Sequence, residues 1–128
     1  MSSLPINHQV LVAVDAARNR IEVVFQGNIG PREMARYEED IRAAISQVRA
    51  EFRLLTDLSA LSSMDSACIP QLERAMDAIN GSGVGRIVRV IPHTSKDIGL
   101  SIMSLFHYRH GLRIITCRTR EEAEQALV

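Results

Sequence analysis

The chain has 128 residues, enough for one domain that builds its own core without disulfides or metals. Its 15 basic and 15 acidic side chains cancel, which excludes a general electrostatic attraction to nucleic acid or to an anionic membrane. The hydrophobic fraction is 46%, typical of a globular protein, and no apolar run approaches the ~18 residues of a membrane span.

The first part of the chain predicts a β-hairpin and a helix. Residues 10–14 and 21–25 are β-branched apolar runs separated by a polar turn, which indicates two antiparallel strands. Residues 27–30 carry two glycines that are expected to break the second strand, and Pro31 then opens a helix at its first position. Apolar residues at helical spacing give this helix its buried face: Met34, Tyr37, Ile41, Ala44, Ile45 and Val48.

The middle of the chain predicts a central strand followed by a second helix. Residues 52–58 are a short apolar run, and residues 61–66 are a serine-rich segment that we expect to form a loop. The helix that follows has Pro70 in its first turn and ends at Asn80 and Gly81. Its apolar face carries Ile69, Leu72, Met76 and Ile79.

The last third predicts two more strands and two more helices. Residues 87–91 and 112–116 are core-type strands, and Asp97 is placed to cap a helix over residues 98–108 between them. Thr119 and Glu122 have capping-box spacing and open a final helix.

The predicted element order is β-β-α-β-α-β-α-β-α over a single domain, residues 1–128. After the hairpin, strands alternate with helices, which implies parallel crossover connections with helices packed on the sheet. The fold class is therefore α/β, with a mixed sheet that begins in an antiparallel hairpin.

The segment after the predicted central strand resembles a known family. Asp57-Leu58-Ser59 followed by Met64-Asp65-Ser66 is similar to the pattern of the STAS domain, in which a strand ending in D-L-S leads to M/I-D-S-S-G and a helix. Residues 25–29 also resemble the exit from the second strand of that domain. The predicted element order matches the STAS domain along nearly the whole chain.

This resemblance implies a bacterial signalling protein that acts by binding rather than by catalysis. Anti-sigma-factor antagonists of this family bind an anti-sigma factor that is also their kinase, and phosphorylation of a serine at the helix start ends the association. By resemblance, the partner surface here comprises Asp57, Asp65, Ser66, Ala67 and Cys68. The usual phosphoacceptor is replaced by Ala67, which has no hydroxyl, so phosphorylation at that position is chemically impossible.

Two alternatives remain open. The first is a small-molecule or anion-binding domain that uses the same helix start, helped by His93 and Lys96 in a segment rich in basic residues. The second is a thiol sensor, because Cys68 lies near a predicted helix N-terminus, where a thiolate is stabilised. No histidine, cysteine or carboxylate spacing indicates a metal site, and no motif indicates a cofactor.

The sequence also predicts where the protein works. Two cysteines are too few for a disulfide framework, and the N-terminal residues lack the charged and apolar regions of a signal peptide. We expect a cytoplasmic protein with reduced thiols that binds a protein partner and neither nucleic acid nor membrane. Pairing of two copies through a sheet edge or a helix face is a further expectation.

Overall fold

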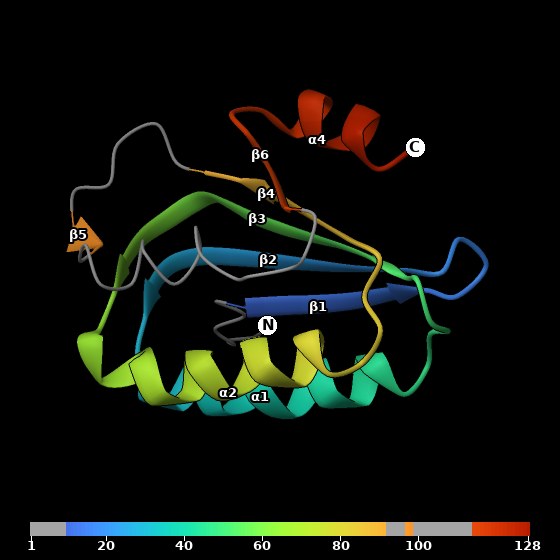
Figure 1. Ribbon diagram of the computed structural model, residues 1–128. Coiled ribbons are helices and arrows are strands. Elements are labelled where there is room, and N and C mark those ends of the chain that lie inside the picture. Colours follow the sequence, from blue (N-terminus) through green and yellow to red (C-terminus); the bar gives the residue numbers. More distant parts are fainter. Residues whose placement is uncertain (1–9, 92–96, 99–113) are drawn as a thin grey trace, which may run out of the picture.

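The computed structural model describes residues 10–91, 97–98 and 114–128. They form a mixed α/β fold in which one sheet separates two layers of helices (Figure 1). Helices α1 (Pro31–Ile45) and α2 (Ile69–Asn80) cover one face, and α4 (Arg120–Ala126) lies on the other. None of the helices in these residues is both long and apolar enough to cross a membrane.

The sheet has the mixed topology that the sequence predicts. Its main path is β1-β2-β3-β4-β6, and among the described strands only β1 and β2 pair antiparallel. The strands of that path are β1 (Val10–Asp15), β2 (Arg20–Ile29), β3 (Arg53–Met64), β4 (Arg86–Val90) and β6 (Ile114–Cys117). A short sixth strand, β5 (Asp97–Ile98), pairs with the end of β3.

The strand β2 does not break at Gly27, and the prediction there is wrong. The strand runs on to Ile29 and stays paired with β3, with shifts of register between Val24 and Gln26 and between Gly27 and Asn28. Gly27 has a φ of 68°, a backbone conformation that side chains disfavour, so glycine suits it. The glycine therefore marks an irregularity inside the strand rather than its end.

The serine-rich segment after residue 58 is also strand rather than loop. Leu61 and Met64 are buried, whereas Ser62 between them is exposed. Ala60, Leu61, Ser63 and Met64 each pair with a residue of β2, so β3 continues to Met64 before the chain turns at Asp65. A single 3-10 turn, η1 (Ser66–Cys68), then leads directly into α2.

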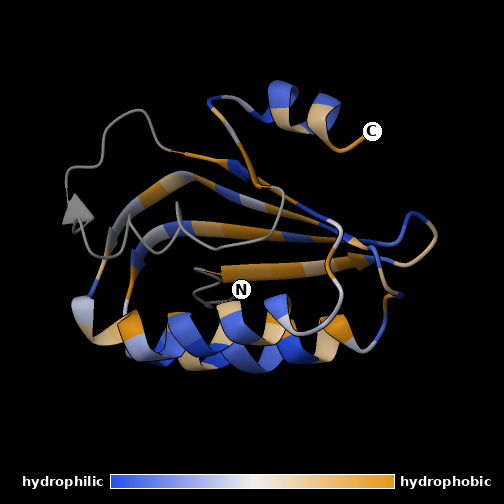
Figure 2. Cartoon of the chain, in the orientation of Figure 1, coloured by the Kyte–Doolittle hydropathy of each residue, from blue (hydrophilic) through white to orange (hydrophobic). Residues whose placement is uncertain are grey.

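The sheet has apolar residues on both faces, and successive residues of β3 supply opposite cores (Figure 2). Leu54 and Leu58 pack with α1 and α2, where the predicted helix faces are confirmed. Leu55 packs in a smaller cluster beneath α4. The helix residues buried against the sheet are Met34, Tyr37, Ile41 and Ala44 of α1, Leu72, Ala75, Met76 and Ile79 of α2, and Ala123 of α4.

Asp97 does not begin a helix, which corrects the sequence prediction. Asp97 and Ile98 form β5 and pair in parallel with Ser63 and Met64. The pairing of β4 with β3 ends at Asp57, so the C-terminal residues of β3 are available to pair with β5. The rest of the predicted third helix lies outside the described residues, as do residues 112 and 113.

The final helix is confirmed together with its cap. The Thr119 side chain accepts a hydrogen bond from the backbone N–H of Glu122 at 3.1 Å. The carboxylate of Glu122 returns to the N–H of Arg118 at 2.8 Å rather than to that of Thr119. The spacing therefore predicted the helix start correctly, although the reciprocal bond falls one residue earlier.

Candidate functional site

Asp65 fixes the backbone where β3 passes into η1 and α2. Its N–H donates to the carbonyl of Ile29 at 3.0 Å, which ties the turn to the end of β2. Its side-chain Oδ1 accepts from the N–H of Ala67 at 2.9 Å, and its carbonyl accepts from the N–H of Cys68 at 2.9 Å. Asp65 is thus the N-cap of η1, and this 3-10 turn separates the cap from α2.

Three side chains at the helix start are exposed to solvent, and the fourth is buried. Asp65, Ser66 and Ala67 are exposed, whereas Cys68 is fully buried. The Cys68 Sγ lies 3.8 Å from the carbonyl oxygen of Ile29, to which it donates a weak hydrogen bond. A partner that approaches this turn would therefore meet Asp65, Ser66 and Ala67 and not the thiol.

The surroundings of Cys68 disfavour a thiolate. Burial, and secondarily the negative charge of Asp65, raise the pKa of the Cys68 thiol to about 11. Cys117 is also buried, and burial raises its thiol pKa as well. Reactive cysteines are accessible and have lowered pKa values, so the environment of Cys68 is the opposite of the one that a thiol sensor needs.

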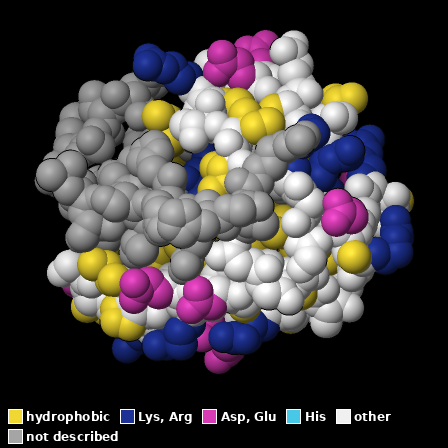
Figure 3. Space-filling view, in the orientation of Figure 1, with side chains coloured by type: hydrophobic (Ala, Val, Ile, Leu, Met, Phe, Trp, Pro, Cys, Tyr) yellow, Lys and Arg dark blue, Asp and Glu magenta, His cyan; other side chains and the backbone are white. Residues whose placement is uncertain are grey.

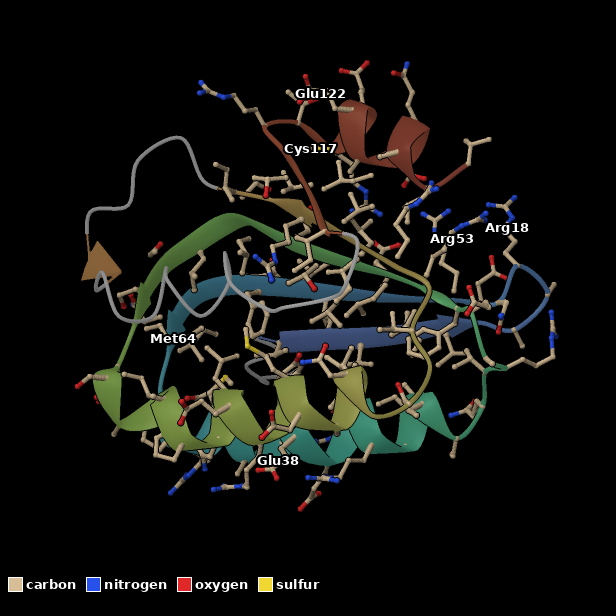
Figure 4. All side chains as sticks on the ribbon, viewed as in Figure 1. Arg18, Glu38, Arg53, Met64, Cys117 and Glu122 are labelled. Carbon is tan, nitrogen blue, oxygen red and sulfur yellow. The ribbon has the colours of Figure 1, made fainter. Side chains whose placement is uncertain are left out.

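A shallow depression of about 450 Å³ adjoins the helix start. It is lined by residues at the ends of β2 and β3: Asn28, Ile29, Gly30, Ser63, Met64 and Asp65. The Ser63 hydroxyl donates to Oδ1 of Asn28 at 2.6 Å, a bond between the two strands. Figure 4 shows Met64 at this end of the sheet, beside the start of α2. Among the described side chains that line the depression, only Asp65 is charged, so this part of the lining is polar without being basic.

Asn28 and Ser63 are members of this surface that the sequence did not single out. Nothing in their local pattern distinguishes them from ordinary loop residues. Only the pairing of Asn28 with Ser63, made possible by the continuation of both strands, brings them together. The carboxyl ends of parallel strands are where α/β folds commonly bind, and that rule is the signal that would have found them.

Asp57 does not lie with the other predicted partner-binding residues. It is buried on the face of the sheet that α4 covers, where its Oδ1 accepts from both the N–H and the hydroxyl of Ser59, at 2.9 and 2.6 Å. Its Oδ2 accepts from Nη1 of Arg120 at 3.2 Å. The strand between Asp57 and Asp65 spans roughly 25 Å at ~3.3 Å per residue. Asp57 therefore anchors α4, and the exposed turn lies elsewhere.

Several predicted positions cannot be placed. His93 and Lys96 lie outside the described residues, as do the other three histidines of the chain. Within residues 10–91, 97–98 and 114–128, no three histidine, cysteine or carboxylate side chains gather in a way that could hold a metal ion.

Comparison with known proteins gives a clear result for the fold. No protein-family model and no curated protein sequence matches the chain. Solved structures do match. The unphosphorylated form of the anti-sigma factor antagonist SpoIIAA is similar with a TM-score of 0.63 at 18% identity, covering 92% of this chain and 96% of the other. The chain has the STAS fold.

Two further structures share the STAS fold with this chain. An uncharacterised protein from Shewanella loihica, described as having a SpoIIAA-like fold, is similar with a TM-score of 0.69 at 9% identity, covering 98% of this chain and 100% of the other. The Bacillus cell fate determinant SpoIIAA in its phosphorylated form is similar with a TM-score of 0.61 at 17% identity, covering 93% and 99%. In this STAS fold, the exposed turn of Asp65, Ser66 and Ala67 occupies the end of the third strand and the start of the second helix.

Proposed function

We propose that the chain is a protein-binding module whose contact surface is the exposed turn of Asp65, Ser66 and Ala67, and that it is not an enzyme. The observation that carries this proposal is the fixed presentation of these side chains. Asp65 accepts a hydrogen bond from the N–H of Ala67 and donates one to the carbonyl of Ile29, and these bonds hold the backbone while all three turn residues are exposed. A preorganised, exposed turn loses little conformational entropy when a partner binds it.

The class of partner comes from the STAS fold together with the motif. SpoIIAA is described as an anti-sigma factor antagonist, and it has been solved in both unphosphorylated and phosphorylated forms. Met64-Asp65-Ser66 of this chain stands at the helix start where that family carries its switch. We therefore take an anti-sigma factor or a kinase-like regulator as the partner.

Ala67 gives the proposed module a specific property. A methyl group replaces the phosphoacceptor hydroxyl, so the usual switch cannot turn binding off at this residue. A phosphate there would add a charge of about −1.5 to −2 beside the carboxylate of Asp65. The chain would thus remain competent to bind its partner whatever the kinase activity around it.

The test is capture of partners from a lysate of the source organism. Wild-type protein, Ser66→Trp and Ala17→Trp are immobilised and incubated with the same lysate, and the retained proteins are identified by mass spectrometry. Ala17 is exposed in the turn between β1 and β2, at the other end of the sheet, so it is a matched control. We expect wild type and Ala17→Trp to retain an anti-sigma factor or kinase-like regulator that Ser66→Trp does not retain.

A second pair of variants tests the role of Ala67. Ala67→Asp places a carboxylate where the family carries a phosphate, and Ala67→Ser restores the hydroxyl without the charge. We expect Ala67→Asp to lose the captured partner and Ala67→Ser to keep it until a kinase acts. Equal retention by Ala67→Asp and wild type would contradict the proposed surface.

Pairing of two copies is proposed through strand β1. This strand forms one edge of the sheet among the described strands, and its Leu11 is 41% exposed. An open edge with an apolar side chain favours strand addition. Light scattering on wild type and Val12→Pro, which removes a backbone N–H from β1, tests whether a dimer forms through this edge.

A further inference from the structure

Three arginines begin three adjacent strands in register. Arg20 of β2 pairs with Arg53 of β3, and Arg53 pairs with Arg86 of β4. Neighbouring strands are ~4.8 Å apart, so the three side chains form a row across the sheet. The residues that follow them (Ile21, Leu54 and Ile87) pack toward α1 and α2. Because successive side chains alternate between faces, all three arginines lie on the α4 face.

The charge of this row is only partly compensated. Nη2 of Arg20 is 2.8 Å from Oε1 of Glu124, an ion pair. Nη1 of Arg86 donates to the carbonyl of Ala126 at 2.7 Å and, more weakly, to a terminal oxygen of Val128 at 3.5 Å. The Arg53 guanidinium has no ion pair or hydrogen bond within the described residues. Like charges directly opposite one another destabilise a sheet. A bound anion would offset the repulsion between these three arginines.

A fourth arginine adds to the same end of the sheet. Arg18, in the turn between β1 and β2, is highly exposed and makes one long contact of 3.7 Å with Asp15. The four guanidinium groups of Arg18, Arg20, Arg53 and Arg86 face Asp15, Glu124 and the terminal carboxylate of Val128, which leaves an excess of one positive charge. Figure 3 shows Lys and Arg side chains gathered on this side of the molecule, and Figure 4 shows Arg18 and Arg53 beside each other there.

These side chains surround a depression of about 520 Å³. Its lining combines three arginines, the Glu124 carboxylate, and two apolar side chains, the last of which belongs to the C-terminal residue: Arg18, Arg20, Arg53, Glu124, Leu127 and Val128. The volume falls within the ~300–1,000 Å³ of pockets that hold small molecules. Guanidinium groups match the geometry of phosphate oxygens and bind them by paired hydrogen bonds.

We propose that this depression binds a phosphate group, free or carried by a small molecule, with Arg53 and Arg18 as its ligands. Arg53 is the principal ligand because it lies in the middle of the row and its guanidinium forms no ion pair with another group among the described residues. Leu127 offers an apolar surface for any organic part of the ligand. The site lies at the beginning of β3, whereas the proposed protein-binding turn follows its end, so the two proposals stand independently.

Calorimetric titration with inorganic pyrophosphate at low ionic strength tests the site. We expect saturable binding at one site, weakened roughly tenfold or more in Arg53→Gln, because a hydrogen bond to a charged group is lost. Arg36→Gln is the matched control, since Arg36 is an exposed arginine with a single 3.8 Å contact to Asp40. Absence of saturable binding, or equal affinity in wild type and Arg53→Gln, would overturn the proposal.

Two further arms complete the experiment. Arg18→Gln changes an exposed side chain that the core does not use, so we expect this variant to fold. Weaker pyrophosphate binding by Arg18→Gln would therefore test the site even if Arg53→Gln fails to fold. Titration with adenosine monophosphate and with inorganic phosphate distinguishes the source of the phosphate group. Tighter binding of the nucleotide identifies a ligand with an organic part against Leu127, and equal binding identifies the free anion.

Discussion

The side chain of Asp65 accepts a hydrogen bond from the backbone N–H of Ala67 at 2.9 Å, across the turn that joins β3 to α2. The free N–H groups at a helix start attract an anion, and here a carboxylate of the chain itself satisfies one of them. Ser66 and Ala67 consequently project outward as surface. An added anion at this turn would meet the charge of Asp65, which is why we assign the turn to a protein partner.

Removal of this cap should destabilise the protein. We expect Asp65→Ala to lower the free energy of unfolding by about 1 kcal/mol, the usual cost of losing a helix cap. Asp65→Asn keeps an oxygen in the same place and should cost less than half as much. Urea unfolding followed by circular dichroism measures both. Equal stability of Asp65→Ala and wild type would mean that the bond contributes nothing.

Cys68 should resist alkylation in the folded protein. It is fully buried, and its pKa is raised to about 11, so almost no thiolate exists at neutral pH. We expect labelling by iodoacetamide to proceed only as fast as the protein opens, and to accelerate in urea. Cys117→Ser removes the other thiol, so that one site is measured. Labelling of the folded variant at the rate of a free thiol would revive the thiol-sensor hypothesis.

The same thiol predicts a loss of stability at high pH. Its usual pKa is 9.0 and its folded value about 11, so the unfolded chain releases the proton first as the pH rises. The stability that the protonated thiol contributes is complete below pH 9.0 and is lost between these two values. Cys68→Ala should flatten this dependence in urea titrations at increasing pH. An unchanged slope in that variant would assign the loss to other groups.

Glu38 links α1 to α2 and predicts a change of stability in acid. Hydrogen bonds from Arg74, at 3.1 to 3.3 Å, lower the pKa of the Glu38 carboxyl below its usual 4.5. Its contribution is therefore present above pH 4.5 and is lost as the pH falls through the folded pKa. Glu38→Gln should be slightly less stable than wild type at neutral pH and should match it in acid. Glu39→Gln, an exposed neighbour, should follow wild type throughout.

Arg120 anchors α4 to the sheet through Asp57, and its replacement should lower the free energy of unfolding. It is 3.2 Å from Asp57, contacts Glu22, and is 3.1 Å from Glu124. Arg120→Gln should cost about 1–2 kcal/mol, less than the loss of a fully buried pair because Arg120 is partly exposed. Asp57→Asn in the same background should recover part of that loss, since it removes a buried negative charge that no longer has an ion-pair partner in Arg120. Full additivity of the two changes would contradict the coupling.

The sequence predicted the fold well because its signals were local. Pro31 and Pro70 mark helix starts, Thr119 and Glu122 mark a cap, and apolar spacing marks the buried faces. The errors arose where pairing between strands decides the outcome. Gly27 lies inside a strand that continues because β3 continues beside it. Asp97 joins the sheet because the C-terminal end of β3 is available for pairing.

The candidate site was predicted in part for the same reason. Asp65, Ser66 and Ala67 are contiguous, so one motif placed all three on one turn. Asp57 belongs to the same motif but lies within β3, where its side chain contacts Arg120 of α4, whereas Asp65 follows the end of that strand. The row of Arg20, Arg53 and Arg86 depends on the register of three strands, which no local pattern reveals.

The most direct test of the central claim is the affinity of the captured partner for purified wild type, Ser66→Trp and Ala17→Trp. We expect a bulky side chain at the centre of the interface to cost about 2 kcal/mol or more, about 30-fold in the dissociation constant. We predict that Ser66→Trp loses at least this much affinity while Ala17→Trp binds as wild type does. Wild-type affinity in Ser66→Trp, with its fold intact, would contradict the assignment of the turn as the binding surface.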